Sequence, residues 1–284
     1  MEYVNLGCGT RYHPDWINID IASSGEGVIA HDLRKGIPLA DASCDAIYHS
    51  HLLEHLRPSQ ALKLMQECYR VQKPGGFLRV AIPDLEQICL RYLEKLQGAL
   101  NGDENAATDY DWILLEMYDQ TVRERKGGLM LEYLSRSPLP NEAFVYERIG
   151  AEGRGIVRAL REHSTRNSAP RPAQGGGVSL LKSLRNLLTV PGIMRQRLLT
   201  RWLGADGLRA LEIGRFRLAG EAHQWMYDRF SLARLMLTAG FQDPIQQTAT
   251  QSQIPNWPSF NLDTLPDGTV VKPDSLFMEA KRQA

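Results

Sequence analysis

Two glycines and an acid in the first twenty residues have the types and spacing that could hold a nucleotide-like ligand. An apolar segment runs into Gly7-Cys8-Gly9, and a second apolar segment, which starts at Trp16, ends at Asp20. Glycine lets a backbone turn sharply and lie against a ligand, because it has no Cβ. A carboxylate at the end of a strand can accept hydrogen bonds from both hydroxyls of a ribose. The pattern predicts a ligand that contains adenosine.

The spacing of these residues argues against a dinucleotide. A dinucleotide site needs a third glycine three residues after the second and an acid roughly twenty residues further on. Tyr12 stands in place of that glycine, and Asp20 follows Gly9 by only eleven positions. With Pro14 between them there is room for about one helical turn, so we expect a loop in place of the first crossover helix. Arg11 then either supplies the positive charge of the missing helix N-terminus or is a solvated surface residue.

The elements that must position these groups follow in the order of a parallel α/β sheet. Apolar patterns predict strands over residues 28–33, 44–50 and 77–83, and a helix over residues 58–71. Asp32 lies in the third strand and Asp84 directly follows the fifth. Because a parallel sheet gathers its ligands at the carboxyl ends of its strands, Asp84 is expected to face the same crevice as Asp20. The alternative is that Asp84 caps the helix that follows.

Taken together, these segments resemble the class I S-adenosylmethionine (SAM) methyltransferases, specifically the type 11 group in a bacterial or cyanobacterial branch. The resemblance covers roughly residues 2–95 and returns over residues 230–241 and 275–281. It implies a Rossmann-like α/β fold whose seven-stranded, mostly parallel sheet ends in an antiparallel pair, with SAM as cofactor. The matching segments are Leu6-Gly7-Cys8-Gly9, Asn18-Ile19-Asp20, His31-Asp32-Leu33, Ser50-His51-Leu52-Leu53-Glu54-His55 and Lys73-Pro74-Gly75-Gly76-Phe77-Leu78.

Composition is that of an ordinary globular protein. The 284 residues include 33 basic and 33 acidic side chains, so the net charge gives no general attraction to nucleic acid. The four cysteines form no close pair, which predicts neither a zinc site nor a disulfide framework, and we expect no metal. No signal peptide and no membrane-spanning run is evident, so a cytoplasmic location is expected.

The middle of the chain lies outside the general family pattern. We expect residues 1–97 and 222–284 to form the SAM-binding domain and residues 98–221 to be a mainly helical insertion, flexible at about 164–177. Residues 179–190 predict an amphipathic helix, and residues 178–220 carry eight basic against two acidic side chains. Such a stretch could contact an anionic membrane or a phosphorylated or lipid-linked substrate. The alternative is a helical subdomain with a solvated basic face.

The resemblance also implies roles for individual residues. Gly7 and Gly9 would pack against the methionine part of SAM, Asp20 would bind the ribose, and Asp32 with Leu33 would border the adenine. Ser50 and His51 would lie close to the sulfonium. The full set expected to contact the cofactor is Leu6, Gly7, Cys8, Gly9, Arg11, Asp20, Ile21, His31, Asp32, Leu33, Ser50 and His51.

Methyl transfer from a sulfonium is an in-line displacement, so a base is needed only when the nucleophile is a hydroxyl or an ammonium. The candidate catalytic residues are His51, Asp84 and His223, and His55, Trp225 and Tyr227 are candidates for substrate binding. A histidine beside aromatic side chains can equally be a packed core residue.

Two functions from different classes are consistent with these features. The first is a SAM-dependent methyltransferase that acts at oxygen on a small, sugar-linked or lipid-linked acceptor. The second is a non-catalytic binding or scaffold protein of the same fold that docks through its basic helical insertion. A nicotinamide-dependent oxidoreductase is disfavoured by Tyr12.

Overall fold

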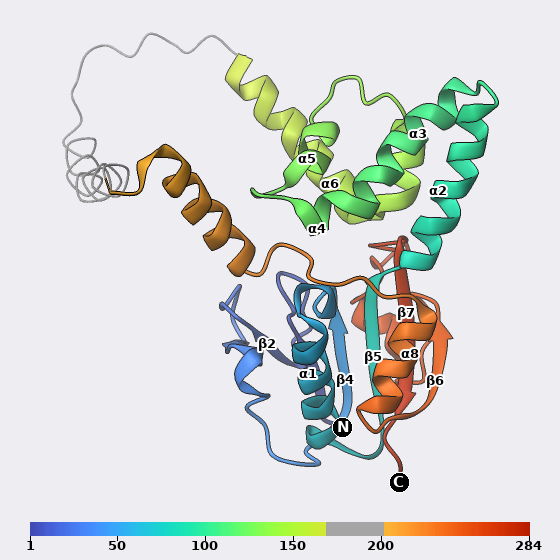
Figure 1. The fold of residues 1–284 in the computed structure, drawn as a ribbon. Helices are drawn as coiled ribbons and strands as arrows, with labels where there is room; N and C mark the ends of the chain where they lie inside the picture. Colours follow the sequence, from blue (N-terminus) through green and yellow to red (C-terminus); the bar gives the residue numbers. More distant parts are fainter. Residues whose placement is uncertain (169–201) are drawn as a thin grey trace.

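Seven strands form one sheet in the computed structural model, which describes residues 1–168 and 202–284 (Figure 1). The order across the sheet is β3-β2-β1-β4-β5-β7-β6. Of these strands only β7 runs antiparallel to its neighbours, β5 and β6. The predicted Rossmann-like, mostly parallel sheet with a final antiparallel pair is therefore confirmed. The strands are β1 Tyr3–Leu6, β2 Ile17–Asp20, β3 Val28–Ala30, β4 Cys44–Ser50, β5 Gln72–Pro83, β6 Gln242–Gln247 and β7 Ser275–Lys281.

A loop joins β1 to β2, where such folds usually have a helix. Residues 7–16 contain no helix, and β1 pairs in parallel with β2, with Val4 opposite Ile17. The predicted short crossover is thus present. The third strand is shorter than predicted and ends at Ala30, because Asp32 caps the 3-10 helix η1 (Leu33–Lys35) by accepting the Arg34 N–H. Asp32 therefore stands beyond the strand, at the carboxyl edge of the sheet.

The two faces of the sheet are covered differently. Side chains alternate between faces along a strand, and in β4 Ile47 packs with the helical side whereas Ala46 and Tyr48 pack on the opposite side. The helical side is covered by α1 (Pro58–Val71) and α8 (Arg229–Thr238). The opposite side is covered by a C-terminal loop, residues 248–274, which contains the short 3-10 helix η4 (Trp257–Phe260).

A layer of helices lies above the carboxyl edge of the sheet (Figure 1). Its core is built around Trp112, Ile113, Val145 and Val157. The helix α2 begins directly after β5 and extends into this layer (Figure 1). The elements are α2 Leu85–Leu100, α3 Glu104–Leu114, the π-helical turn η3 Leu115–Asp119, α4 Gln120–Val122, α5 Gly128–Leu134, α6 Glu142–Ser168 with a break at Gly150, and a helix over residues 202–218.

Part of the sequence-based interpretation falls outside the described residues. The expected flexible segment begins within α6, which continues to Ser168, and the rest of it is not among the described residues. The predicted amphipathic helix at 179–190 also lies outside them. The domain boundaries at 97 and 221 remain predictions. Within the described ranges, no helix combines the length and apolar character that a bilayer crossing requires.

A buried guanidinium connects the sheet to the C-terminal loop. Arg79 on β5 has 0% of its side chain exposed and donates to Asp263 at 2.8 Å and to Glu279 at 2.8 Å. Tyr48 donates to the other Asp263 oxygen at 2.5 Å, and the Arg79 guanidinium lies 4.3 Å from the Trp257 ring centre. These partners come from two neighbouring strands and from the C-terminal loop, so this interaction holds the loop on the sheet.

Replacing Arg79 by Met should destabilise the protein by about 3–5 kcal/mol, because it leaves the carboxylates of Asp263 and Glu279 in the interior without their cation. The free energy of unfolding measured in urea tests this. The matched control is Arg91→Met, which removes an exposed pair with Glu94 and should cost less than about 1 kcal/mol. Equal losses in the two variants would contradict the assigned role of Arg79.

Candidate functional site

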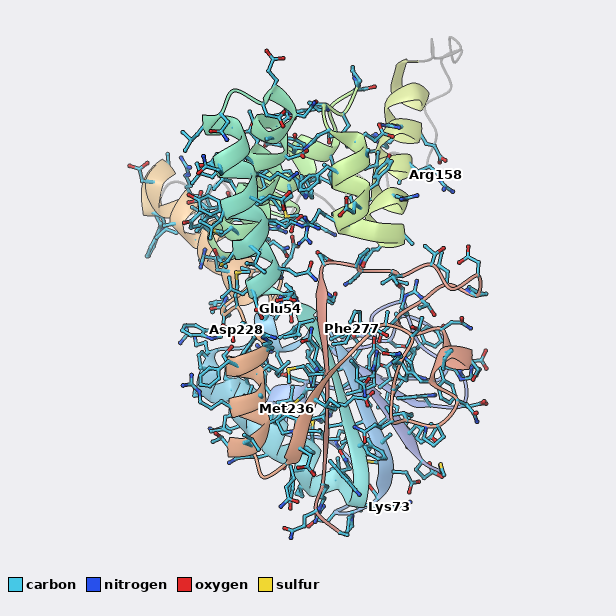
Figure 2. The ribbon with its side chains drawn as sticks, turned by 90° about the vertical axis from the view of Figure 1, so that its right-hand side faces the viewer. Glu54, Lys73, Arg158, Asp228, Met236 and Phe277 are labelled. Carbon is cyan, nitrogen blue, oxygen red and sulfur yellow. The ribbon has the colours of Figure 1, made fainter. Side chains whose placement is uncertain are left out.

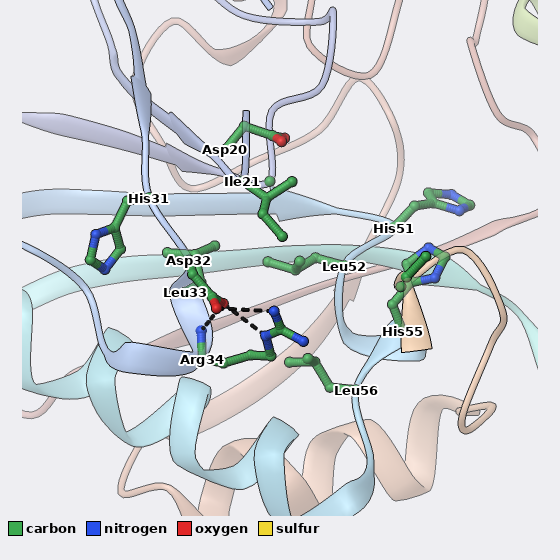
Figure 3. Close-up of a pocket in the computed structure, with 13 residues that line it drawn as sticks. Asp20, Ile21, His31, Asp32, Leu33, Arg34, His51, Leu52, His55 and Leu56 are labelled. Carbon is green, nitrogen blue, oxygen red and sulfur yellow. Dashed lines mark hydrogen bonds and ion pairs between the residues drawn. The ribbon is translucent and has the colours of Figure 1, made fainter. Parts of the chain in front are cut away.

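Two neighbouring cavities lie at the carboxyl edge of the sheet and share Gly7, His51 and His55. The first has a volume of about 270 Å³ and is shown in Figure 3. The second has a volume of about 580 Å³. Both are lined by residues that follow strands β1 and β4, as expected for a ligand site in a parallel sheet.

The first cavity has an acidic wall and an apolar wall. Asp20, at the end of β2, lines it, and its Oδ2 accepts the Gly9 N–H at 2.8 Å. Asp32 is held by two hydrogen bonds from Arg34, at 2.8 and 3.0 Å, which lower the pKa of the Asp32 carboxyl (Figure 3). The apolar lining consists of Ile21, Leu33, Leu52 and Leu56, with Ala219.

The glycine turn leaves open space beside the cavities. Gly7 and Gly9 have φ of +64° and +54°, a left-handed conformation that favours glycine. A Cβ added to Gly9 would meet no atom within 4 Å, so this backbone faces free volume rather than packed protein. A ligand can approach the main chain here.

The second cavity extends from the glycine turn to the C-terminal loop. Its lining includes Cys8, Arg11 and Ser50, and it also includes Glu152 and Lys272, whose ion pair at 3.1 Å connects α6 to the loop. Arg11 donates through Nη1 to the carbonyl oxygens of Asn261, at 2.9 Å, and Thr264, at 3.4 Å. Arg11 is therefore anchored at the cavity wall and is not the solvated surface residue of the alternative interpretation.

His51 stands where the two cavities adjoin. Its backbone φ is +51°, which is uncommon for a residue with a Cβ and is a strain that recurs at functional sites. Its Nε2 lies 2.9 Å from the Ser275 hydroxyl, and its Nδ1 lies 3.2 Å from Glu54 Oε1. The carboxylate of Glu54 thus orients the imidazole of His51 from its Nδ1 side.

Glu54 forms a buried cluster with His55 and His223. It belongs to the 3-10 helix η2 (Leu53–His55), has 1% of its side chain exposed, and lies at the level where the helical layer meets the sheet (Figure 2). The rings of His55 and His223 meet edge to face with centres 4.8 Å apart. Burial raises the pKa of Glu54, but the contact with the His51 ring and the charges of all three histidines outweigh it and hold that pKa at about 2. Burial lowers the pKa of His223 to about 3.

Several predicted site residues lie away from the cavity walls. Asp84 caps α2, its Oδ1 accepting the Gln87 N–H at 3.2 Å, and it lines neither cavity. Tyr227 packs in the core beneath α8, and Trp225 is 50% exposed. His223 contacts His55 from behind, and Leu6 is fully buried in the sheet.

Sequence reasoning missed the apolar contribution of Leu52 and Leu56 and the approach of residues 219–220 to the first cavity. The Leu-Leu-Glu-His-Leu segment was a signal for the leucines. Nothing local indicated residues 219–220, because they reach the cavity only through the return of the chain from the helical layer.

Comparison with known proteins identifies the part of the chain that carries this site. Residues 4–80 match the family model described as a methyltransferase domain. This N-terminal segment of the chain is therefore similar to a methyltransferase domain. A protein from Mycolicibacterium smegmatis, described as a probable S-adenosylmethionine-dependent methyltransferase, is 34% identical over 101 residues, which are 29% of this chain and 38% of that protein. The chain thus spans well under half the length of this relative.

Solved structures with remote similarity include two that span nearly the whole chain. One is a SAM-dependent methyltransferase and possible histamine N-methyltransferase from Thermotoga maritima, at 13% identity, 99% coverage of this chain and 82% of that chain, with a TM-score of 0.37. The other is a SAM-dependent methyltransferase from Archaeoglobus fulgidus, at 12% identity, 99% and 86% coverage and a TM-score of 0.37.

The match to a methyltransferase domain and the relative described above imply SAM as the cofactor, and residues of the two adjoining cavities fit that molecule. A ribose needs an acceptor of two hydroxyl hydrogen bonds, and Asp20 keeps lone pairs free beyond its bond to Gly9. Ile21 is a large apolar side chain left 64% exposed at the cavity, where a purine ring could cover it. The open space at Gly9 could receive the amino-acid part.

Another buried histidine, His49 on β4, makes no side-chain hydrogen bond in the described part of the chain. Both of its ring nitrogens are buried and lack a hydrogen-bond partner in the described part of the chain. Burial lowers the pKa of His49 from 6.5 to about 4. The unfolded chain therefore takes up this proton near pH 6.5, whereas the folded protein takes it up only near pH 4, so stability falls as the pH decreases through that window.

Replacing His49 by Leu should reduce the loss of unfolding free energy between neutral pH and pH 4, because it removes a group that the folded protein protonates only at low pH. It should leave the stability at pH 7 unchanged or higher, because it removes two buried polar atoms without partners. The contribution of His49 over the window is at most about 3 kcal/mol. Urea unfolding of both proteins at several pH values between neutrality and pH 4 measures it. Parallel curves for the two proteins would show that His49 does not carry this dependence.

Proposed function

We propose that the protein is a SAM-dependent methyltransferase that methylates an oxygen of a small, sugar-linked or lipid-linked acceptor. The observation that carries the proposal is the position of His51, whose side chain borders both the cavity that fits SAM and the larger, more polar second cavity. A donor in the first cavity and an acceptor in the second would meet there.

The first cavity and the adjoining glycine-turn end of the second cavity offer separate groups for each part of SAM. Asp20 would accept the ribose hydroxyls, and Ile21 and Leu33 would enclose the adenine beside Asp32. Gly7, Cys8 and Gly9 would lie along the methionine part, with Arg11 as the cation for its carboxylate. Because one nitrogen of Arg11 already bonds backbone carbonyls, its guanidinium is positioned before a ligand arrives.

The second cavity supports an acceptor with hydroxyl groups. Its lining combines the carboxylate of Glu152 with the ammonium of Lys272 and the hydroxyl of Ser50, all of which suit a polyol such as a sugar. SAM, when bound, supplies a methyl group attached to a positively charged sulfur. A hydroxyl nucleophile must lose its proton as it attacks that methyl.

His51 is placed to take that proton. One of its ring nitrogens faces Glu54, whose negative charge would stabilise the imidazolium that forms, and the other lies beside Ser275. His223, the other predicted base, reaches this point only through the ring of His55. Asp84 is engaged as a helix cap. We therefore assign the base to His51.

Replacing Asp20 by Ala should weaken SAM binding by about 10- to 100-fold, the loss expected for hydrogen bonds to a charged group. Titration calorimetry with SAM and with S-adenosylhomocysteine measures it. Asp15→Ala is the control, because that carboxylate is exposed and lies outside both cavities. A wild-type protein that binds neither compound would refute the proposed function.

Replacing His51 by Gln should reduce methyl transfer by about 10²- to 10⁴-fold, the usual contribution of a general base, and should change SAM affinity by much less. Transfer of labelled methyl from SAM into an extract of the source organism measures the first effect, and calorimetry measures the second. Asp84→Asn is the comparison, since a cap should affect stability rather than transfer. Undiminished labelling by His51→Gln would remove the base from the mechanism.

A further inference from the structure

We propose that Glu54, His55 and His223 form a binding site for one divalent transition-metal ion of the Zn²⁺ type. Two imidazoles and one carboxylate are a donor set that such ions prefer, and they leave one coordination position open. The cluster lies behind His51, and one of its members, His55, lines both cavities.

The three side chains are already close enough to converge on one ion. One ligand atom from each of them lies within 4.8 Å of the other two. Zinc bonds to nitrogen and oxygen are about 2.1 Å long, so ligand atoms around a tetrahedral ion are about 3.4 Å apart. Side-chain rotations that bring these atoms closer together by up to about 1.4 Å would complete the site.

Unpaired buried atoms provide a second, independent reason. Glu54 is 1% exposed, yet neither of its oxygens has a hydrogen bond of good geometry; Oε1 has only the charge contact with His51 at 3.2 Å. The Nδ1 of His55 is also buried without a partner in the described chain. A buried carboxylate with so few partners is costly. A bound cation would take one Glu54 oxygen and one nitrogen of His55 as ligands, while the other Glu54 oxygen keeps its contact with His51.

The backbone holds these ligands in place from two directions. The Glu54 carbonyl accepts the amides of Gln224, at 2.6 Å, and Trp225, at 3.2 Å, and the His223 amide donates to Gln120 at 2.9 Å.

The site would connect the two parts of the protein and deepen the proposed reaction. Glu54 and His55 come from η2, next to the sheet, whereas His223 lies on the segment that returns from the helical layer, so an ion would cross-link them. The open position on the side of His55 would take an acceptor oxygen and lower the pKa of its hydroxyl. This role, unlike the ion binding itself, rests on the proposed function.

The test uses the full-length protein after dialysis against a chelator. Titration with Zn²⁺ followed by calorimetry should give one site, and Co²⁺ should give the visible absorption of a nitrogen and oxygen site without a thiolate charge-transfer band. His223→Gln and Glu54→Gln should each weaken binding at least tenfold, and His13→Gln, a histidine outside the cluster, should not. The ion should also raise the melting temperature of the wild type.

Three results would overturn the metal site: no binding by folded wild type, equal binding by wild type and the two cluster variants, or a Co²⁺ spectrum with thiolate ligation. Circular dichroism checks folding of each variant. If His223→Gln or Glu54→Gln does not fold, His55→Gln, at the partly exposed edge of the cluster, replaces it. SAM binding is measured on the same samples, so protein that binds the ion but not SAM would refute the proposed function and retain the metal site.

Discussion

The burial of Arg79 is the constraint on which much of this structure depends. A guanidinium cannot stay in a protein interior unless carboxylates and carbonyls surround it, and its pairs with Asp263 and Glu279 are both fully buried. Asp263 lies in the C-terminal loop, so satisfying Arg79 requires that the loop lie on the sheet. Without this loop, the face of the sheet opposite the helices α1 and α8, which carries the Trp16 and Tyr48 rings, would be exposed to water.

The placement of this loop in turn shapes the functional site. Its carbonyls at Asn261 and Thr264 hold Arg11, and its residues Leu265, Val271 and Lys272 form the wall of the second cavity. On the other side, the Glu54 carbonyl receives the chain that returns from the helical layer. The segment that is similar to a methyltransferase domain thus provides the strand ends, while the two later segments of the chain enclose the space above them.

The sequence predicted the regular elements closely where the signal was local. The bounds of β4 and α1 match the predicted segments, because apolar patterns and helical periodicity depend on the burial of neighbouring side chains along one element. The third strand was predicted too long, since it ends before Asp32, whose carboxylate accepts the Arg34 N–H and caps the following 3-10 helix. Asp84 could not be assigned from sequence, because an acid after a strand serves equally as a cap or as a ligand.

By itself, the sequence determined the fold class and the short first crossover, since these follow from glycines, acids and apolar periods a few positions apart. The residues expected to hold SAM were implied by its resemblance to a known family. Only the tertiary structure decided that Glu54 and His55 meet His223, and that Arg79 meets Asp263. Those pairs are separated by more than 160 residues, and their contacts depend on how the whole chain returns to the sheet edge. The types of these side chains and their spacing in the sequence do not show how far apart they lie in space, because that distance depends on the fold of the whole chain.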